Sequence, residues 1–370
     1  MQIEIYNMIP VKDKLSITLE AICDSFSSLL WDVEYYSCGA FEVYIAASPQ
    51  NIEIFKTGRI VGRDDDKEHF GLIESVEIQT DAEDGDYLIV RGRFLMCLLE
   101  RRIIYPTVNF TKETTYADII KSVVLFNAVV SGVRRIPGLS VGISTGSCWE
   151  QKTKLQISYD NLMEWIYKIC EKIGGTANIR LSKTTNEQYA MILELSQGSD
   201  RSIMQNENPH IIFSDGYNNL LSFSYSTDIS VQKNFAYIFG KGEGEERKRT
   251  TYCNGSEPAH LDRYEVYVDA KDMSDEEQID GETKPIPEAE YIEMLKEKGK
   301  QSIILPLTES ESQIAVQSTQ FRYNTDYFAG DYVTVEHRRF GLRQNKIQLI
   351  GMIESFDQNG RNLSPTFKEV

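Results

Sequence analysis

The sequence predicts an α+β fold in which antiparallel β strands dominate. Apolar and polar side chains alternate in several segments near both ends of the chain, which is the pattern of half-buried strands. A five-residue motif occurs twice, as GLIES at 71–75 and as GMIES at 351–355. Each copy follows a glycine-led segment, at 58–61 or at 330–333. This shared order predicts a duplicated β module, with helical patterns in the stretches between the copies.

Length and composition bound the class of protein. The 370 residues predict two to four domains, and 41% hydrophobic with 11% aromatic residues is enough to form packed cores. The net charge of −17 argues against a general nucleic-acid-binding surface, because phosphate neutralisation needs Lys and Arg. An acidic surface ordinarily keeps a protein soluble. Along a channel it would also keep DNA from adhering to the wall.

Cysteine usage and the apolar segments point to a chain made in a cytosol. Six cysteines occur without any Cys-x-x-Cys spacing, so we expect buried reduced thiols. Acidic residues interrupt the apolar stretches near the N-terminus, which does not fit a signal peptide. No run of about 20 apolar residues occurs, so no membrane-spanning segment is expected.

Residues 1–105 read as strands. Phe41, Val43 and Ile45 alternate with polar neighbours, and the turn signal at 84–86 predicts a hairpin leading into a strand at 87–91. A short helix is expected at 93–102.

Residues 106–205 read as an α+β region. Thr115 opens a capping pattern for a helix through 119–130, and Ser158 is the expected cap of a second helix. The second helix carries an apolar stripe that includes Trp165, ends at Gly174, and is followed by a strand at 190–195.

Strand patterns return at 221–226, 235–239 and 264–269. Residues 271–300 hold ten acidic and five basic residues, a net of −5, and predict a helix over 288–298 that ends at Gly299. The last strands are expected at 332–336 and 346–356.

Motifs for chemistry are weak in this chain. The segment GKGEG at 240–244 lacks the further glycine of a dinucleotide fingerprint, because position 245 is Glu, and it fits a glycine-rich hairpin or bulge. The four histidines have no metal-ligand spacing, and 64–66 fits a solvated acidic turn better than a cation site. We therefore predict no catalytic, cofactor-binding or metal residues and no cofactor. A pair of carboxylates acting as a hydrolase remains open.

A family resemblance rests on several of these segments. They are FAYIFGKGEG at 235–244, then Arg247 or Arg249, DRYEVYVDA at 262–270, GAFEV at 39–43, FGLIE at 70–74, VRGRF at 90–94, LLERR at 98–102 and GDYV at 330–333. Together they resemble the siphophage tail-tip or baseplate hub proteins, which include the N-terminal hub part of tail-associated lysins. The resemblance thins at 130–210 and 275–320.

The resemblance implies two tube-like antiparallel β-barrel domains with two smaller α/β insertion domains. The first barrel would comprise 1–105 plus about 206–230, and the second 231–270 plus 320–370. Residues 106–205 and 271–319 would be the insertions, the latter small and acidic. We expect structural roles for six glycines and a channel-facing or ring-facing position for five acidic loop residues: Gly71, Gly240, Gly242, Gly244, Gly330 and Gly351, and Asp64, Asp65, Asp66, Glu83 and Asp84.

The resemblance also implies a homotrimer that closes the distal end of a tail tube. Two modules in each of three copies would present six near-equivalent units. The implied partners are the tail tube, the distal tail protein, central fibre or receptor-binding proteins, and DNA in passage without specific binding. The implied location is the virion, with assembly in the host cytoplasm. The end of the sequence at Val370 favours a hub without a lytic extension. Two alternatives stay open: a tail-associated cell-wall hydrolase, and the hub of a contractile tail or a phage-tail-like bacteriocin.

Overall fold

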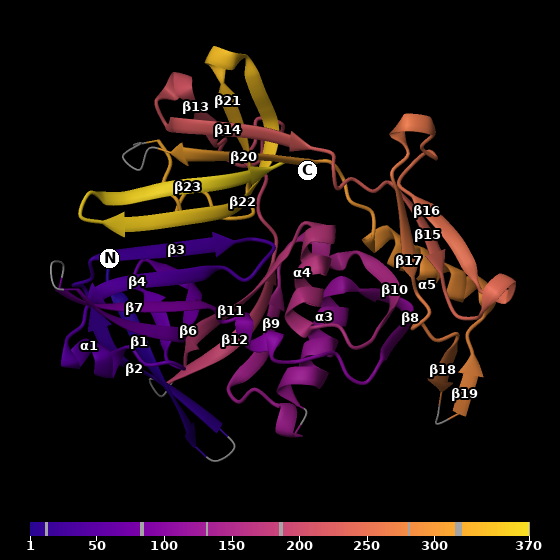
Figure 1. The fold of residues 1–370 in the computed structure, drawn as a ribbon, viewed down its shortest axis with the longest axis horizontal. Helices are drawn as coiled ribbons and strands as arrows, with labels where there is room; N and C mark the ends of the chain where they lie inside the picture. The colour runs from indigo at the N-terminus through magenta and orange to yellow at the C-terminus, as the bar shows by residue number, and fades with distance from the viewer. Residues whose placement is uncertain are drawn as a thin grey trace.

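The computed structural model describes residues 1–11, 14–81, 85–130, 132–184, 188–279, 282–314 and 320–369 (Figure 1). Strands dominate, as the sequence predicts. Four hydrophobic cores organise them: one inside each of two β modules, one in the helical region at 106–196, which extends onto the first module, and one in a small sheet at 235–301.

The first module is built from the N-terminal strands and two short helices. Its strands pair in the order β3-β4-β7-β6-β5-β1-β2. Phe41, Val43 and Ile45 are buried inside it with Trp31, which confirms the predicted alternation. The elements are β1 (Ile3–Val11), β2 (Lys14–Cys23), β3 (Ser28–Glu34), β4 (Ala40–Ala46), α1 (Pro49–Ile54), β5 (Ile60–Arg63), β6 (Asp66–Asp81), β7 (Gly85–Phe94) and α2 (Cys97–Glu100).

The second module comes from two distant parts of the chain. Its strands are β13 (Ile212–Ser214), β14 (Leu220–Asp228), β20 (Leu307–Ile314), β21 (Tyr332–His337), β22 (Leu342–Asp357) and β23 (Gly360–Lys368). They pair in the order β14-β20-β23-β22-β21, with β13 beside β21. The first module has the same order, β3-β4-β7-β6-β5. The predicted duplication is therefore present in the strand topology.

The strand ladders show which residues of the two modules correspond. Gly58 and Gly330 both have positive φ, and their N–H groups donate to Ile73 and Leu349, respectively. The register shift after Ile73 in β6 matches the shift after Leu349 in β22. These pairs relate β6 to β22 by an offset of 276 residues, whereas the two sequence motifs are 280 residues apart. Ladder position 351 thus corresponds to Ser75, and the sequence echo is displaced by four residues from the structural repeat.

The two modules share one continuous sheet. Strand β22 pairs antiparallel with β3, so the sheet runs from β14 at one end to β2 at the other (Figure 1). Among the described residues the path is open and does not close on itself.

The grouping of residues 206–230 differs from the sequence expectation. They were expected in the first module, but β13 and β14 pair with β21 and β20 of the second. Alternation along 221–226 indicates a half-buried strand, and it carries no information about which sheet that strand joins. The segment 231–270 likewise forms a sheet of its own.

The helical region lies against the first module and contains two small sheets. Helix α3 begins after Thr115, whose hydroxyl accepts a hydrogen bond from the Asp118 N–H, as expected. Helix α4 is capped by Asn161 and not by Ser158, and it ends at left-handed Gly174 as predicted. The elements are β8 (Val108–Thr115), α3 (Tyr116–Val124), a π-helical turn (Leu125–Val129), β9 (Leu139–Ser144), β10 (Lys152–Ile157), α4 (Leu162–Ile173), β11 (Thr176–Lys183) and β12 (Tyr189–Ser196).

The small sheet packs on one helix. Strand β15 pairs antiparallel with β16 and parallel with β17, and α5 covers it. The expected end of this helix at Gly299 is wrong, because α5 continues to Gln301 and Gly299 is buried within it. Gly299 packs directly on Ile238, where a Cβ would come within 2.5 Å of its Cδ1. The elements are β15 (Phe235–Phe239), β16 (Arg249–Cys253), β17 (Glu265–Asp269), β18 (Glu276–Ile279), β19 (Glu282–Pro285) and α5 (Glu288–Gln301).

The two motif glycines differ in how closely they are enclosed, which gives a first prediction. A Cβ on Gly71 would lie 2.2 Å from Phe41 Cε1, whereas one on Gly351 would first meet the flexible Glu34 carboxylate at 3.2 Å. We expect Gly71→Ala to lower the free energy of unfolding by about 1–3 kcal/mol through overpacking. The matched Gly351→Ala should cost less. Urea unfolding of both variants measures this, and equal losses would contradict it.

Candidate assembly site at the junction of the two modules

The junction between the modules is a two-strand contact with a buried face. Strands β3 and β22 pair from Glu34 opposite Gly351 to Leu29 opposite Phe356. Side chains alternate across this contact. Leu29, Trp31 and Val33 of β3 are buried, and they lie opposite Phe356, Glu354 and Met352 of β22. A single buried carboxylate, Glu354, thus enters an otherwise apolar interface.

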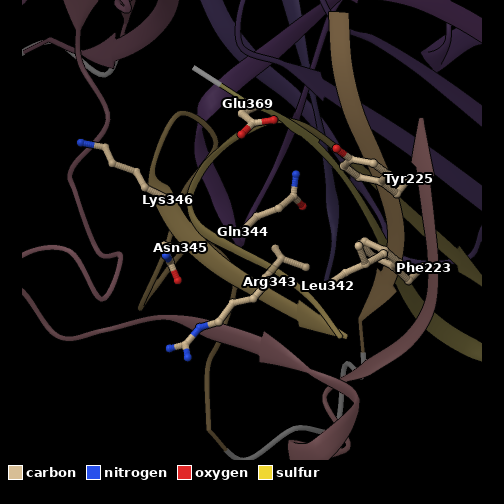
Figure 2. A pocket seen from close by; sticks show the side chains of 9 residues that line it. Phe223, Tyr225, Leu342, Arg343, Gln344, Asn345, Lys346 and Glu369 are labelled. Atoms are coloured by element: carbon tan, nitrogen blue, oxygen red, sulfur yellow. The ribbon is translucent and has the colours of Figure 1, made fainter. Parts of the chain in front are cut away.

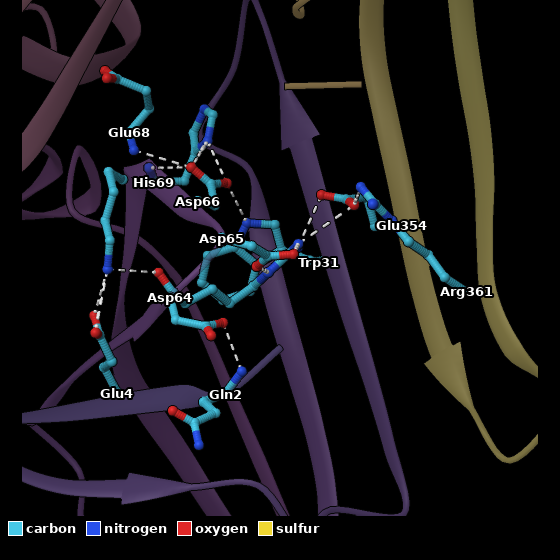
Figure 3. A network of polar contacts seen from close by, with 12 residues as sticks. Gln2, Glu4, Trp31, Asp64, Asp65, Asp66, Glu68, His69, Glu354 and Arg361 are labelled. Carbon is cyan, nitrogen blue, oxygen red and sulfur yellow. Dashed lines mark hydrogen bonds and ion pairs between the residues drawn. The ribbon is translucent and has the colours of Figure 1, made fainter. Parts of the chain in front are cut away.

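Glu354 is neutralised by arginines from both modules (Figure 3). Arg63 Nη1, at the end of β5, donates to Glu354 Oε1 at 2.8 Å, and both side chains are fully buried. Arg361 of β23 also pairs with Glu354, and Asp65 pairs with Arg63 at 2.9 Å. Burial disfavours the charged guanidinium of Arg63, but the carboxylates of Asp65 and Glu354 outweigh this and raise its pKa. The pair ties β5 of one module to β22 of the other.

Two aromatic rings hold the Arg63 guanidinium in place. Its central carbon lies 5.4 Å from the centroid of Trp31 and 4.8 Å from that of Phe356. Cation–π contacts of this kind are strongest where water is excluded, as it is here. Arg63, Trp31 and Phe356 therefore form one packed unit across the junction.

A second buried carboxylate, that of Asp66, accepts a hydrogen bond from the Trp31 indole. Asp66 Oδ2 accepts hydrogen bonds from Trp31 Nε1 at 3.0 Å and contacts His69 Nδ1 at 2.9 Å. Its other oxygen accepts from the backbone N–H groups of Glu68 and His69. Burial raises the pKa of Asp66, but His69, Arg63 and these hydrogen bonds prevail and hold it well below its usual value. The same carboxylate overcomes the effect of burial on His69 and raises its pKa.

The acidic loop residues that were expected to face a channel or ring differ in their exposure to solvent. Asp64 is exposed and accepts from the Gln2 N–H at 2.6 Å, and Asp65 is partly exposed. Asp66 is only 3% exposed, so it cannot face a channel, because its oxygens are used inside the module. Glu83 and Asp84 lie outside the described residues.

The six glycines of the sequence analysis are not gathered at one place. Gly240, Gly242 and Gly244 lie in the β15–β16 hairpin, which confirms the hairpin interpretation of that segment. Gly330 lies near the junction with a φ of +96°, and a Cβ there would come within 2.1 Å of the Tyr35 ring. Any side chain at 330 would thus collide with the residue that directly follows β3.

The sequence reasoning missed a polar face of the shared sheet. Opposite the buried face of β3, β4, β7 and β6, charged side chains lie among uncharged ones such as Leu30, Tyr44 and Gln79. Arg91 bridges Glu42 and Glu77, and Arg93 pairs with Glu74. Alternation indicated that one face of these strands is polar, but only the pairing of the modules places these groups on one surface: Asp32, Glu34, Glu42, Glu77, Arg91 and Arg93.

The described residues offer neither a metal-binding cluster nor a membrane-spanning helix. They hold no group of three or more His, Cys, Asp or Glu side chains placed to bind a metal ion. None of the helices there is long and apolar enough to cross a membrane. The six cysteines are free thiols, four of them buried.

The fold is similar to those of three tail proteins, two of them from prophages. The tail protein of Neisseria meningitidis MC58 superposes with a TM-score of 0.59 at 13% identity, covering 99% of this chain and 96% of that one. The 43 kDa tail protein of prophage MuSo2 from Shewanella oneidensis gives 0.54 at 12%, with 99% and 97% covered. Prophage tail protein gp18 from Listeria monocytogenes EGD-e gives 0.53 at 12%, with 99% and 94% covered. These superpositions over nearly the whole chain show a common fold.

Residues 3–367 match the family described as siphovirus ReqiPepy6 Gp37-like protein, and the chain belongs to this family. The resemblance to a siphophage tail protein family is thereby confirmed. No curated protein sequence matches the chain.

The raised pKa of His69 gives a pH prediction. A histidine with a raised folded-state pKa stabilises the protein fully below its unfolded pKa, and this contribution is lost as the pH rises through the folded value. Asp66 stays ionised throughout, because its pKa is lowered. We therefore expect His69→Gln to lower the free energy of unfolding more at pH 6 than at pH 9. Urea unfolding at both values measures the difference, and a loss that does not depend on pH would contradict this assignment.

Proposed function

We propose that this protein is a structural hub of a phage tail. Three copies form a ring that closes the distal end of the tail tube, leaves a channel for DNA, and carries the tail-tip, fibre or receptor-binding proteins. The observation that carries the proposal is the repeated strand order of the two modules within one sheet. A trimer of such chains presents six similar units, which suits a tube built with six-fold symmetry.

The open path of the sheet fits this role. Within one chain, the pairing of β3 with β22 joins the two modules into one sheet. The sheet ends at β14 on one side and at β2 on the other. We propose that the tube-like barrels implied by the resemblance are completed between neighbouring copies, since closure removes exposed strand edges. The helical region and the β15–β17 sheet with α5 would then be insertions around the tube.

The polar face of the sheet is the proposed wall of the channel. Its carboxylates repel the phosphates of passing DNA, and the ion-paired arginines leave little free positive charge to bind them. The net charge of −17 acts in the same direction. DNA would therefore pass without specific contacts.

The proposed partners are the tail tube, the distal tail protein, and the central fibre or receptor-binding proteins. The proposed location is the virion tail, after assembly in the host cytoplasm. The same ring would also serve the hub of a contractile tail or of a phage-tail-like bacteriocin, and images of whole particles distinguish these settings.

The mass of the purified chain and its appearance by electron microscopy test the proposal. We expect a trimer mass and a three-fold ring with a central hole. A chain that remains monomeric, both when purified and within tails, would overturn it.

We propose that the role is not catalytic. A peptidoglycan-clearing assay with the purified chain tests this against the hydrolase alternative. Reproducible clearing that is lost on substitution of a single glutamate would replace the hub proposal with an enzymatic one.

A further inference from the structure

The internal repeat gives each of the two junction strands, β22 and β3, a counterpart in the other module. At the junction, residues 351–356 of β22 pair with 29–34 of β3. By the ladder correspondence, 351–356 match 75–80 of β6 in the first module. Through β23 and β20, residues 29–34 match 223–228 of β14 in the second module. The counterparts of the junction strands are thus the 75–80 part of β6, which extends beyond its pairing with β5, and β14, which ends the sheet.

Within the described residues, both of these counterparts are edges without a strand partner. Segment 75–80 of β6 pairs with β7 on one side, and its other edge has no strand in the described chain, because β5 pairs only with 66–72. Strand β14 pairs only with β20. Edge strands of this kind are templates for pairing with another chain.

The side chains on these edges are apolar on the matching face. Ile78 is 55% exposed, Tyr225 is 43% exposed, and Val76 and Phe223 are half-buried. Ile78 stands at the ladder position of Glu354, and Tyr225 stands at that of Trp31. At the junction Glu354 and Trp31 lie opposite each other, and both are buried. The buried junction residues Trp31 and Glu354 thus have exposed apolar counterparts, Tyr225 and Ile78, at these two edges.

A pocket lies beside the β14 edge, at the place where the junction holds Glu354. It has a volume of about 350 Å³ (Figure 2). Its apolar lining comes from Phe223, Tyr225, Val335 and Leu342, and its polar lining from Arg343, Gln344, Asn345, Lys346 and Glu369. The pairing of β5 with β6 has a register shift just before Arg63, and the pairing of β21 with β22 has one just before Val335. Val335 therefore corresponds to Arg63. The groups that surround Glu354 at the junction, Trp31 and Arg63, are therefore represented here by Tyr225 and Val335. On the side of the pocket formed by Phe223, Tyr225 and Val335, an entering side chain would meet apolar groups.

We propose that β6 of one copy pairs antiparallel with β14 of a second copy, in the register of the β3–β22 junction. Ser75 then lies opposite Asp228, Gln79 opposite Ser224, and Ile78 opposite Tyr225, with the Ile78 side chain in the pocket. This inference rests on the proposed trimer and names its subunit interface. The internal junction is held by a buried ion pair, and the contact between copies by apolar side chains.

Cysteine cross-linking tests the register. The variant Q79C/S224C places thiols at directly opposed positions on the polar face. In the control Q79C/D228C the second thiol is four residues away, roughly 13 Å along the strand, which is too far for a disulfide. Under mild oxidation we expect Q79C/S224C to give covalently linked dimers and trimers on a non-reducing gel. The control and the wild-type chain, with its six native thiols, should not.

A second variant tests the apolar contact. Ile78→Glu should convert the trimer to a folded monomer, because the carboxylate would be buried against Tyr225 and Val335, and Val335 stands in the place of the arginine that neutralises Glu354 at the junction. Its thermal midpoint should match that of a wild-type monomer obtained by dilution. Leu261→Glu alters a residue that is 93% exposed and lies in a turn between β16 and β17 of the separate small sheet, so it should remain trimeric.

The outcomes separate this inference from the proposed function. A trimeric wild-type chain in which Q79C/S224C does not cross-link, or in which Ile78→Glu stays trimeric, would overturn the interface and leave the hub proposal standing. A wild-type chain that is monomeric both when purified and within tails would overturn both. Cross-linking of Q79C/D228C at the level of Q79C/S224C would overturn the register.

Discussion

Replacing Glu354 with Ala is expected to lower the free energy of unfolding by about 3–5 kcal/mol, because removal of one partner leaves a buried charge uncompensated. Arg63 is fully buried, and its remaining carboxylate partner, Asp65, is partly exposed. Arg361 would also lose its partner. The loss should appear in urea unfolding at one fixed protein concentration, since association shifts apparent stability.

A double replacement provides the control. Arg63→Met with Glu354→Leu removes both charges and keeps apolar volume between Trp31 and Phe356, and such exchanges are often neutral or stabilising. We expect the double variant to recover most of the stability that Glu354→Ala loses. A loss of less than about 1 kcal/mol in the free energy of unfolding of Glu354→Ala would contradict the burial of the Arg63–Glu354 pair, because exposed ion pairs contribute only that much.

The second large effect is expected at Trp165. Its side chain is 5% exposed in the core beneath α4, where it packs with apolar residues of α3 and of the small sheets. Trp165→Ala should cost about 3–5 kcal/mol through lost transfer free energy and the cavity left behind. Lys168, which is exposed on the same helix, is the matched control, and Lys168→Ala should change stability by less than about 0.5 kcal/mol. Similar losses for the two variants would show that this face of α4 is not the core face.

Elements governed by neighbouring residues could be predicted from the sequence. The cap at Thr115 depends on a hydroxyl and an N–H three residues apart, and the left-handed end at Gly174 depends on the absence of a side chain. Where two local signals competed, the prediction was less reliable. Ser158 and Asn161 are both good capping residues, and Asn161 is the one that caps α4, through the N–H groups of Met163 and Glu164.

The candidate site was much harder to predict. Glu354 was noticed as part of a repeated motif, but nothing adjacent to it in sequence announces its pairing with Arg63, which is 291 residues away. Asp66 is the last of three consecutive aspartates, which the sequence does not distinguish. Its burial beneath Trp31 separates it from Asp64 and Asp65. The polar face depends likewise on which strands become neighbours.

The sequence by itself determined the β-dominated class, the positions of most strands and helices, and the presence of a duplicated module, because alternation, capping and glycine-led turns act over a few residues. Only the tertiary structure decided that 206–230 joins the second module, that the true repeat is displaced by four residues from the motif echo, and that one continuous sheet unites the two modules. The physical reason is that ladder hydrogen bonds are alike for every strand. The choice of partner therefore depends on side-chain packing between residues far apart in the chain.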